Sequence, residues 1–372
     1  MPRLARLLVG NTDRVPDLTY ATGLFVPDDF AWFQTASGKT FALLGPLEID
    51  RARRTGRADL FLDLSDEEKQ MGPGKHPFPK TLANVLRRHG IRSAEIPCTF
   101  PIGLAHSLTQ AGLKLQSVPE PFFPKRLTKS SLEVRHITQA IRAAEAGLAR
   151  AVQILKITKI RRDHTLVWSG SVLTSERLRT EMEIACLRHG ALARDTIVAC
   201  GSQACDPHER GRGPLYAHQS IILDIFPRNS STGYFGDITR TVVKGHASEA
   251  LRHLRAAVNK GQQRVLSQTR VSANGQKIQD ELRNWFRDQG YPTEIKKGRW
   301  NGFFHGVGHG LGLEIHEAPR FAISRLPLNS VLTVEPGLYV PGIGGVRIED
   351  VVVVQRQGFK KLTRFPNLWE IR

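Results

Sequence analysis

Apolar and polar positions alternate in two different rhythms along the first third of the chain. Residues 40–44 and 60–64 form short apolar runs of strand length, whereas residues 82–89 carry apolar side chains at helical spacing. Strand-like and helix-like stretches therefore follow one another from about residue 18 to residue 124. This order predicts a small α/β domain.

Both rhythms break in the segment PEPFFPKRLTKSS, residues 119–131, which is rich in proline, serine and lysine. A chain of 372 residues with 40% hydrophobic content exceeds what one core usually holds, so two domains are expected. We place the boundary inside this segment. The first domain then covers 1–126 and the second covers 127–372.

The second domain combines long helices with strands. Helical patterns cover residues 131–156, 175–189 and 275–289. Thr174 or Ser175 can cap the second helix, and Gly190 and Gly290 can end the second and third in the left-handed conformation. Strand-like runs cover 221–226, 238–243, 330–334 and 351–354. This mixture predicts an α+β domain with substantial antiparallel pairing.

The formal net charge of +18 is compatible with a polyanionic partner such as nucleic acid. The densest basic clusters are KITKIRR, residues 156–162, and KKGR, residues 296–299. Neither cluster is interleaved with aromatic residues that could stack on bases, and the sequence has no RRM, zinc-finger or helix-turn-helix signature. Solvated basic faces are therefore the preferred interpretation, and nucleic-acid binding is the minority one.

The sequence has no apolar stretch of the roughly 18 residues that a membrane span requires, and its apolar start is too short for a secretory signal. We therefore expect a soluble cytoplasmic protein without membrane association. The four cysteines have no CxxC spacing and are expected to be reduced thiols. Cys200 and Cys205 are interpreted as small buried apolar residues.

Two aspartates stand inside or beside apolar strand-like runs. Asp224 lies in IILDIFP and Asp237 in YFGDITRTVV. A buried carboxylate is unfavourable unless a cation or hydrogen bonds compensate it, and a metal ion is a common compensation. For either aspartate alone, a turn cap or a pair with an arginine such as Arg240 explains the pattern equally well. Two such residues in neighbouring strands favour a metal.

Three histidines and two glutamates extend this pattern. His305, His309 and His316 lie within FFHGVGHGLGLEIHEAP, whose glycines allow close backbone approach. Glu335 ends one apolar strand and Glu349 begins another. Four carboxylates and one neutral imidazole can hold two divalent cations a few ångströms apart.

These segments, in this order, resemble the creatinase/aminopeptidase or "pita-bread" family of metallopeptidases (M24), and in particular its Xaa-Pro aminopeptidase and prolidase branch. The similar motifs are DIF…GDITRT, GHGLGLEIHE, VEPGLY and GVRIED, between about residues 128 and 354. Weaker similarity covers LTYATGLFV and GPLEIDRAR near the N-terminus. The resemblance implies an α+β pita-bread catalytic domain preceded by a smaller α/β creatinase-like N-terminal domain.

The resemblance also assigns roles to individual positions. The implied metal ligands are Asp224, Asp237, His309, Glu335 and Glu349. His208 and His316 match histidines beside the substrate, Glu335 is the implied proton carrier, and His305 and Arg347 match residues of the substrate pocket. His218 is a rival for the role of His208, but its place just before a strand favours a structural role.

One departure from the family pattern concerns the two aspartates. The stretch between Asp224 and Asp237 is about two residues longer than the usual hairpin, and Pro227 replaces a common glycine. A longer hairpin tip costs little entropy if the flanking strands keep their register.

A member of this branch implies hydrolysis of Xaa-Pro bonds in short peptides with proline at the second position, by a hydroxide that bridges two divalent ions. Manganese is the expected metal, with cobalt, zinc or iron as alternatives, and a homodimer is the implied assembly. The alternatives are a creatinase-like hydrolase or lyase, and a basic protein that uses the fold to bind protein or nucleic acid. A methionine aminopeptidase is disfavoured because it would lack most of the first 125 residues.

Overall fold

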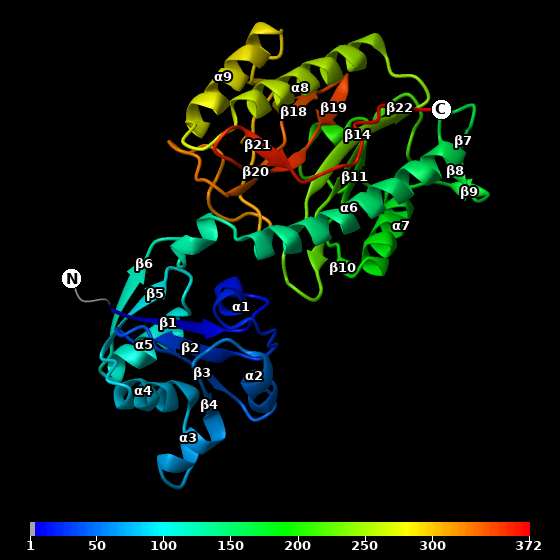
Figure 1. Ribbon diagram of the computed structural model, residues 1–372. Helices are drawn as coiled ribbons and strands as arrows, with labels where there is room; N and C mark the ends of the chain where they lie inside the picture. The colour runs from blue at the N-terminus through cyan, green and yellow to red at the C-terminus, as the bar shows by residue number, and fades with distance from the viewer. Residues whose placement is uncertain (1–3) are drawn as a thin grey trace. The chain divides into compact units, whose positions relative to one another are not determined.

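The structure is a computed structural model that describes residues 4–372. The chain divides into two compact units, Met1–Pro124 and Lys125–Arg372 (Figure 1). This division lies between residues 124 and 125, close to the boundary expected between residues 126 and 127. Each unit is described by itself.

A six-stranded mixed sheet forms the centre of the first unit. Its strand order is β4-β3-β2-β1-β5-β6, with antiparallel pairing of β1 to β2 and of β2 to β3, and parallel pairing elsewhere. The strands are β1 (Ala5–Gly10), β2 (Phe30–Gln34), β3 (Thr40–Leu44), β4 (Leu60–Asp63), β5 (Ser93–Pro97) and β6 (Lys114–Val118). The helices are α1 (Pro16–Thr22), α2 (Ile49–Thr55), α3 (Leu64–Gln70), α4 (Phe78–Arg88) and α5 (Ile102–Gln110).

Helices cover both faces of this sheet, because successive side chains of a strand point to opposite faces. Leu7 and Val9 pack in one core with Leu82 of α4, whereas Leu8 packs in the other core with Ile49 of α2. The small α/β arrangement predicted for this region is therefore present.

Four long helices pack around the strands of the second unit. They are α6 (Ser131–Ile157), α7 (Ser175–Arg188), α8 (Glu249–Gln268) and α9 (Gly275–Asp288). The side chain of Ser130 and that of Glu133 cap the start of α6 reciprocally, and Thr174 caps α7. The three predicted helices are confirmed to within a few residues, and α8 was missed.

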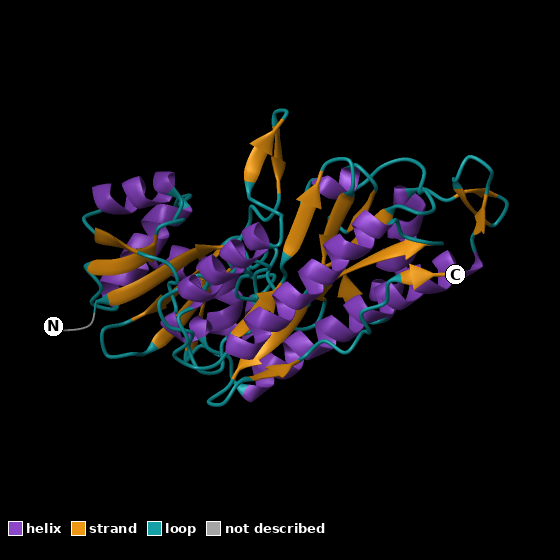
Figure 2. Cartoon of the chain, turned by 90° about the horizontal axis from the view of Figure 1, so that it is seen from above, coloured by secondary structure: helices purple, strands orange, loops and turns teal. Residues whose placement is uncertain are grey.

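The strands of the second unit lie between these helices (Figures 1 and 2). One sheet has the order β11-β12-β14-β22, from Ile197–Cys200, Ser220–Ile225, Ile238–Lys244 and Glu370–Ile371. A second contains β17 (Val331–Val334), β20 (Asp350–Val354) and β21 (Phe359–Lys361), and β18 (Gly337–Val340) pairs with β19 (Gly344–Arg347). Apolar residues of α6 and α7 pack on the first sheet, and those of α8 and α9 pack on the others. The expected antiparallel content is confirmed, because β12 with β14 and β17 with β20 pair in this way.

Short strands and 3₁₀ helices (η) make up the remaining elements, of which η1 begins at the last residue of the first unit. They are η1 (Pro124–Leu127), β7 (Lys159–Ile160), β8 (Leu166–Trp168), β9 (Ser171–Val172), β10 (Ala191–Leu192), η2 (Gln203–Cys205), β13 (Arg228–Asn229), β15 (Glu294–Lys296) and β16 (Arg299–Asn301). All four cysteines are free thiols, of which Cys98 is exposed and the other three are buried. Within residues 4–372, no helix is long and apolar enough to cross a bilayer.

Candidate metal centre

Asp224 and Asp237 lie at the same end of the β12–β14 pair. Asp224 stands opposite Thr239 in the register, and Asp237 directly precedes the first residue of β14. The longer connection leaves this register intact, and part of it forms a short strand, β13, which pairs with β10. The side chains of both aspartates are buried, so the departure in hairpin length has not displaced either of them from the interior.

His309 lies in a loop that packs against β17. Its amide donates to Thr333 Oγ1 at 3.0 Å, and its carbonyl accepts from the Thr333 amide at 2.9 Å. This approach requires glycine at position 308, where a Cβ would stand 2.0 Å from the Thr333 carbonyl oxygen. The ring Nδ1 lies 3.1 Å from the Gly310 carbonyl oxygen, so Nδ1 carries the proton in that bond and Nε2 is left as an acceptor.

Glu335 and Glu349 approach His309 from two paired strands. Glu335 follows the last residue of β17 and Glu349 precedes the first residue of β20. A threonine orients each of them: Thr333 Oγ1 donates to Glu335 Oε1 at 3.2 Å, and Thr239 Oγ1 donates to Glu349 Oε2 at 2.7 Å. Each carboxylate keeps its other oxygen for a further ligand.

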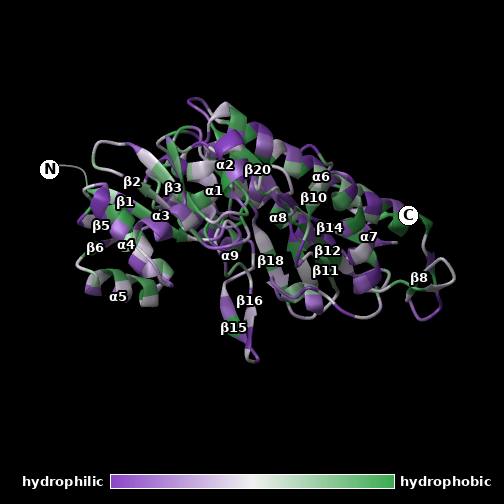
Figure 3. Cartoon of the chain, turned by 90° about the horizontal axis from the view of Figure 1, so that it is seen from below, coloured by the Kyte–Doolittle hydropathy of each residue, from purple (hydrophilic) through white to green (hydrophobic). Residues whose placement is uncertain are grey.

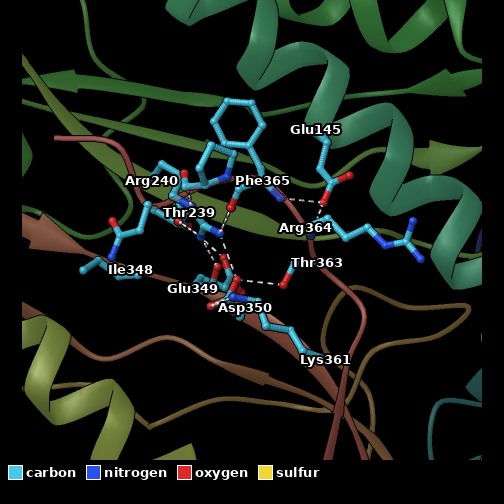
Figure 4. A network of polar contacts seen from close by, with 12 residues as sticks. Glu145, Thr239, Arg240, Ile348, Glu349, Asp350, Lys361, Thr363, Arg364 and Phe365 are labelled. Carbon is cyan, nitrogen blue, oxygen red and sulfur yellow. Dashed lines mark hydrogen bonds and ion pairs between the residues drawn. The ribbon is translucent and has the colours of Figure 1, made fainter. Parts of the chain in front are cut away.

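A buried arginine fixes the backbone around Glu349 (Figure 4). Arg240 donates to the Glu349 carbonyl oxygen and, at 2.9 Å, to Asp350 Oδ1. Asp350 also accepts from Thr363 Oγ1 at 2.7 Å, so the chain after β21 is tied to the same group. The sequence had offered Arg240 as a partner of the aspartates at 224 and 237. That alternative was wrong, because Arg240 binds Asp350.

The carboxylates and the imidazole converge on one buried point. Ligand atoms of Asp237, His309 and Glu349 all lie within 4.8 Å of one another. His309 Nε2 is 3.3 Å from Glu335 Oε1 and 3.8 Å from Asp237 Oδ2. The predicted ligands on four different segments are therefore brought together, with Asp224 beside them.

The electrostatics of this cluster are those of a cation site. Burial, and then repulsion by Glu349 and Asp224, raises the pKa of Asp237 well above its ordinary range. Burial raises the pKa of Glu335 to about 7 and lowers that of His309 to about 3, which keeps the imidazole neutral. Oδ1 of Asp224 and Oδ1 of Asp237 are buried without a hydrogen-bond partner. Divalent cations fit this donor set, because they would neutralise the carboxylates and bind the unpartnered oxygens.

Arg347 binds the fourth carboxylate of the cluster. Its Nη2 lies 2.7 Å from Asp224 Oδ2, and its Nη1 donates to Tyr339 Oη at 2.9 Å and to the Pro207 carbonyl oxygen at 3.3 Å. Arg347 is almost fully buried, at 3% exposure. Asp224 therefore has an arginine partner as the sequence allowed, but that arginine comes from β19 instead of β14.

The other predicted histidines surround this cluster. The ring of His316, an exposed residue, lies 4.3 Å from that of His309 in an edge-on arrangement. His305 Nε2 is 3.0 Å from Tyr339 Oη, and burial, with Arg347 and His208 nearby, lowers the pKa of His305 to about 3. His208 is exposed and follows the Pro207 carbonyl that Arg347 binds.

His218 has a different environment from these residues. Its Nδ1 lies 3.0 Å from the His246 carbonyl oxygen and 3.1 Å from the His246 amide nitrogen, and its ring meets that of His164. These contacts agree with the structural role that its place before a strand indicated.

Sequence reasoning missed three residues that support the cluster. Thr239 and Thr333 orient the two glutamates, and Tyr339 connects Arg347 to His305. Thr333 and Tyr339 each place a hydroxyl group in an otherwise apolar strand, Thr239 follows an apolar residue at the start of β14, and all three are close in sequence to a predicted ligand. A buried hydroxyl needs a hydrogen-bond partner, and that requirement is the signal that could have identified them.

Known proteins are similar to this chain along most of its length. Metallopeptidase family M24 matches residues 135–356. An Xaa-Pro dipeptidase of Pyrococcus horikoshii is 29% identical over 327 residues, which cover 82% of each chain. The solved structure of an X-Pro aminopeptidase from Thermotoga maritima has a TM-score of 0.81 at 23% identity and covers 99% of this chain and 97% of that one. For an Xaa-Pro dipeptidase from Bacillus anthracis the TM-score is 0.82 at 22% identity, covering 99% and 95%.

The similarity to these two structures extends over almost the whole chain and shows that it has their fold. The predicted α+β pita-bread fold is confirmed. The creatinase-like character of the N-terminal domain stays a prediction.

Proposed function

The chain belongs to metallopeptidase family M24, and from that premise we propose that it hydrolyses Xaa-Pro peptide bonds in short peptides with a dinuclear metal centre. The observation that carries this proposal is the buried convergence of Asp237, His309 and Glu349 within 4.8 Å. The Xaa-Pro specificity is supported by the names of the relatives, one of which is an Xaa-Pro dipeptidase that aligns with 82% of this chain.

Five residues would hold the two cations. Asp237, His309, Glu335 and Glu349 form the cluster itself, and Asp224 adds its unpartnered Oδ1. Carboxylate oxygens with a single imidazole suit manganese, and cobalt, zinc and iron are the alternatives. Arg347 holds the other oxygen of Asp224 at 2.7 Å and so turns Oδ1 of that carboxylate away from itself.

Two divalent ions in this position would polarise the scissile carbonyl and lower the pKa of a bound water. Glu335 is the proton carrier toward the leaving nitrogen, because its side chain is 19% exposed whereas Asp237 and Glu349 are almost fully buried. His316 and His208 are the hydrogen-bond donors for the developing negative charge on the carbonyl oxygen.

The substrate would be held on the side of the proline by His305 and Arg347. The His305 ring is neutral and hydrogen-bonded to Tyr339, and the Arg347 guanidinium contributes a fixed positive charge behind it. A positive charge in this position favours peptides or products with a nearby carboxylate. A homodimer is also part of the proposal, on the family resemblance alone.

Activity assays on the metal-loaded protein test the proposed function. Protein loaded with Mn²⁺, Co²⁺ or Zn²⁺ is incubated with Ala-Pro, Ala-Pro-Ala and Met-Ala-Ser. Cleavage of Ala-Pro alone identifies a dipeptidase, and cleavage of Ala-Pro-Ala identifies an aminopeptidase. Failure to cleave either proline peptide under every metal would overturn the Xaa-Pro assignment.

Variants of the ligands connect that activity to the cluster. We expect His309→Ala and Asp237→Ala to lower kcat/KM by at least 10³-fold and to lose bound metal, because each removes a ligand. His218→Ala is the matched control, since this histidine binds the backbone of residue 246. Unchanged turnover in both ligand variants would place the chemistry elsewhere.

A further inference from the structure

The strands β15 and β16 form a hairpin that projects from the second unit (Figures 2 and 3). Its turn residues, Lys297 and Gly298, both have positive φ values, of 50° and 74°. Positive φ at both central positions is the geometry of a type I′ turn, whose twist matches that of paired strands. The hairpin therefore has a defined shape and faces of its own.

One face of this hairpin is apolar and exposed. Ile295 and Trp300 stand opposite each other in the register, so both side chains lie on the same face. Their exposed fractions are 60% and 53%. A two-stranded hairpin gains little stability from apolar side chains that stay in water, so this pair is better explained by a ligand than by folding.

A continuous set of aromatic contacts joins this face to the metal centre. The Trp300 ring stacks on Phe304 at a centroid distance of 5.9 Å, and Phe304 lies 5.3 Å from Tyr339. Tyr339 Oη is 3.0 Å from His305 Nε2 and 2.9 Å from Arg347 Nη1. The base of the hairpin is attached to β18 as well, because the amide of Gly302 donates to the Tyr339 carbonyl oxygen at 3.0 Å.

The other face and the turn of the hairpin are basic. Lys296, Lys297 and Arg299 lie there, and Glu294 pairs with Lys296 at 2.6 Å. An excess of positive charge remains at the tip. Such a tip attracts a carboxylate, and the C-terminus of a short peptide carries one.

We propose that this hairpin binds the part of a peptide substrate that follows the proline, with Ile295 and Trp300 contacting an apolar side chain and the basic tip attracting the terminal carboxylate. The direction rests on the proposed function, because His305 and Arg347 hold the proline side and the aromatic contacts lead outward from them. Because Phe304 lies between Trp300 and the Tyr339–His305 pair, a peptide side chain that contacts Trp300 belongs to a residue beyond the proline. The preferred substrates are therefore longer than dipeptides.

Binding of product-like peptides tests this proposal without requiring turnover. Dissociation constants of Pro-Ala and Pro-Ala-Phe are measured on the metal-loaded full-length protein by calorimetry. We expect Pro-Ala-Phe to bind about tenfold more tightly, because one aromatic contact with buried apolar area contributes on this scale. In Trp300→Ala the ratio of the two dissociation constants should fall to about one. In Trp300→Phe most of the tenfold ratio should remain.

Two controls separate recognition from folding. Ile157→Ala removes an exposed apolar side chain, at 68% exposure, from the end of α6 and should keep the wild-type ratio. Equal unfolding midpoints of the Trp300 variants and the wild-type protein establish that the variants fold. Ile295→Ala should lower the ratio by an intermediate amount, since this residue shares the face of Trp300.

The outcomes distinguish this proposal from the one on which it rests. If the wild-type protein binds Pro-Ala-Phe no more tightly than Pro-Ala, the hairpin proposal is overturned even if Ala-Pro is cleaved. A tenfold ratio that Trp300→Ala leaves unchanged overturns it as well. If Trp300→Ala instead converts a dimer to a monomer in sedimentation, the face binds a second copy of the chain, and the proposal is wrong. Failure to cleave any Xaa-Pro peptide, with the ratio intact, rejects only the reaction.

Discussion

At the scale of single residues, the candidate metal centre brings several carboxylate side chains close together. Two unit charges 4 Å apart repel by about 4 kcal/mol at an effective dielectric constant of 20. Burial and mutual repulsion raise the pKa values of Asp237 and Glu349 well above their ordinary range. Without a bound cation, the protein is therefore destabilised at this cluster.

This repulsion predicts opposite effects of Asp237→Asn with and without metal. In chelator, the variant should be more stable than the wild-type protein by about 1–2 kcal/mol, because asparagine removes the cost of either burying the charge of Asp237 or protonating its carboxyl group. With saturating Mn²⁺ the wild-type protein should be the more stable of the two, because it keeps the ligand. Urea unfolding under both conditions measures the difference.

Asp288→Asn is the matched control for that experiment. Asp288 lies at the end of α9, its side chain is 61% exposed, and it is outside the cluster. Its substitution should change stability by less than about 0.5 kcal/mol under both conditions. A variant at position 237 that is less stable than wild type in chelator would contradict the electrostatic account.

The residue types of the site could be predicted from sequence, but the partners of some residues could not. Arg240 is close to Asp237 in sequence, and this proximity suggested a pair. Arg240 stands opposite Leu223 in the register, one position from the pair of Asp224 and Thr239. Adjacent strand positions face opposite sides, so Arg240 points away from Asp224 and reaches Asp350 instead. The actual partner, Arg347, is 123 residues away, and only the tertiary fold brings it near.

At the scale of elements, the loop that carries His305, His309 and His316 (the histidine loop) contains glycines with very different amounts of space around them. A Cβ at position 308 would lie 2.0 Å from the Thr333 carbonyl oxygen, whereas at position 306 the nearest atom would be 3.6 Å away. We predict that Gly308→Ala abolishes activity although it removes no ligand, because the loop must move away from β17 and carry His309 with it. Gly306→Ala should retain activity within about threefold. Metal content and kcat/KM of the two variants, measured side by side, check this, and equal losses in both would refute it.

A buried ionic group connects the histidine loop to the segment that precedes α6. Glu317 Oε2 accepts from Arg126 at 2.6 Å, and Glu317 Oε1 lies 2.7 Å from Lys129 Nζ. The Glu314 amide also donates to Glu317 Oε2, at 3.2 Å. Burial alone would raise the pKa of Glu317, but the charges of Lys129 and Arg126 lower it below its ordinary value. Removal of one member leaves the others buried and unpaired.

Glu317→Gln is therefore expected to lower the free energy of unfolding by about 3 kcal/mol at pH 7. Because the folded-state pKa is depressed, this stabilisation is fully present above the unfolded-state pKa of about 4.3 and is lost as the pH falls through the lower, folded-state value. The difference in free energy of unfolding between the wild-type protein and the variant should become smaller below about pH 4. Urea unfolding between pH 3 and 7 measures it.

Glu314→Gln provides the comparison for the ionic group. Glu314 contacts the same arginine at 2.6 Å, but its side chain is 45% exposed. Its loss should therefore lower stability by less than about 1 kcal/mol, without a marked change in that loss with pH. Equal effects of the two substitutions would show that burial is not what makes Glu317 important.

A helix could be predicted from the sequence where apolar residues recur regularly along one of its faces. The helices α6, α7 and α9 follow clear caps, with Ser130, Thr174 and Asn274 each accepting from a first-turn amide. The helix α8 also has a capping serine, but its buried face includes Gly261 and Gln262. The Gln262 amide donates to the carbonyl oxygens of Val334 and Ile348, next to Glu335 and Glu349. A polar residue that supports the site thus interrupted the apolar pattern by which the helix could have been found.

At the scale of the whole molecule, a net charge of +18 coexists with an acidic candidate metal centre. The acidic groups of the centre are buried except for Glu335, which is partly exposed, whereas the lysines and arginines of the two basic clusters lie largely at the surface. Surface charge governs solubility and association, and buried charge governs metal binding. The basic balance therefore does not argue against a cation site.

The two compact units should respond differently to metal, since each has its own apolar packing and the proposed ligands all lie in the second. Metal at 100 times its dissociation constant stabilises the unit that binds it by about 2.7 kcal/mol. Calorimetry of the full chain in chelator and in Mn²⁺ should therefore show one transition that moves to higher temperature and one that does not. In His309→Ala, which lacks one proposed ligand, neither transition should move when Mn²⁺ is added. A single transition that moves to higher temperature in Mn²⁺ would mean that the two units unfold together. If that single transition does not move in His309→Ala, the stabilisation by metal still belongs to the metal centre.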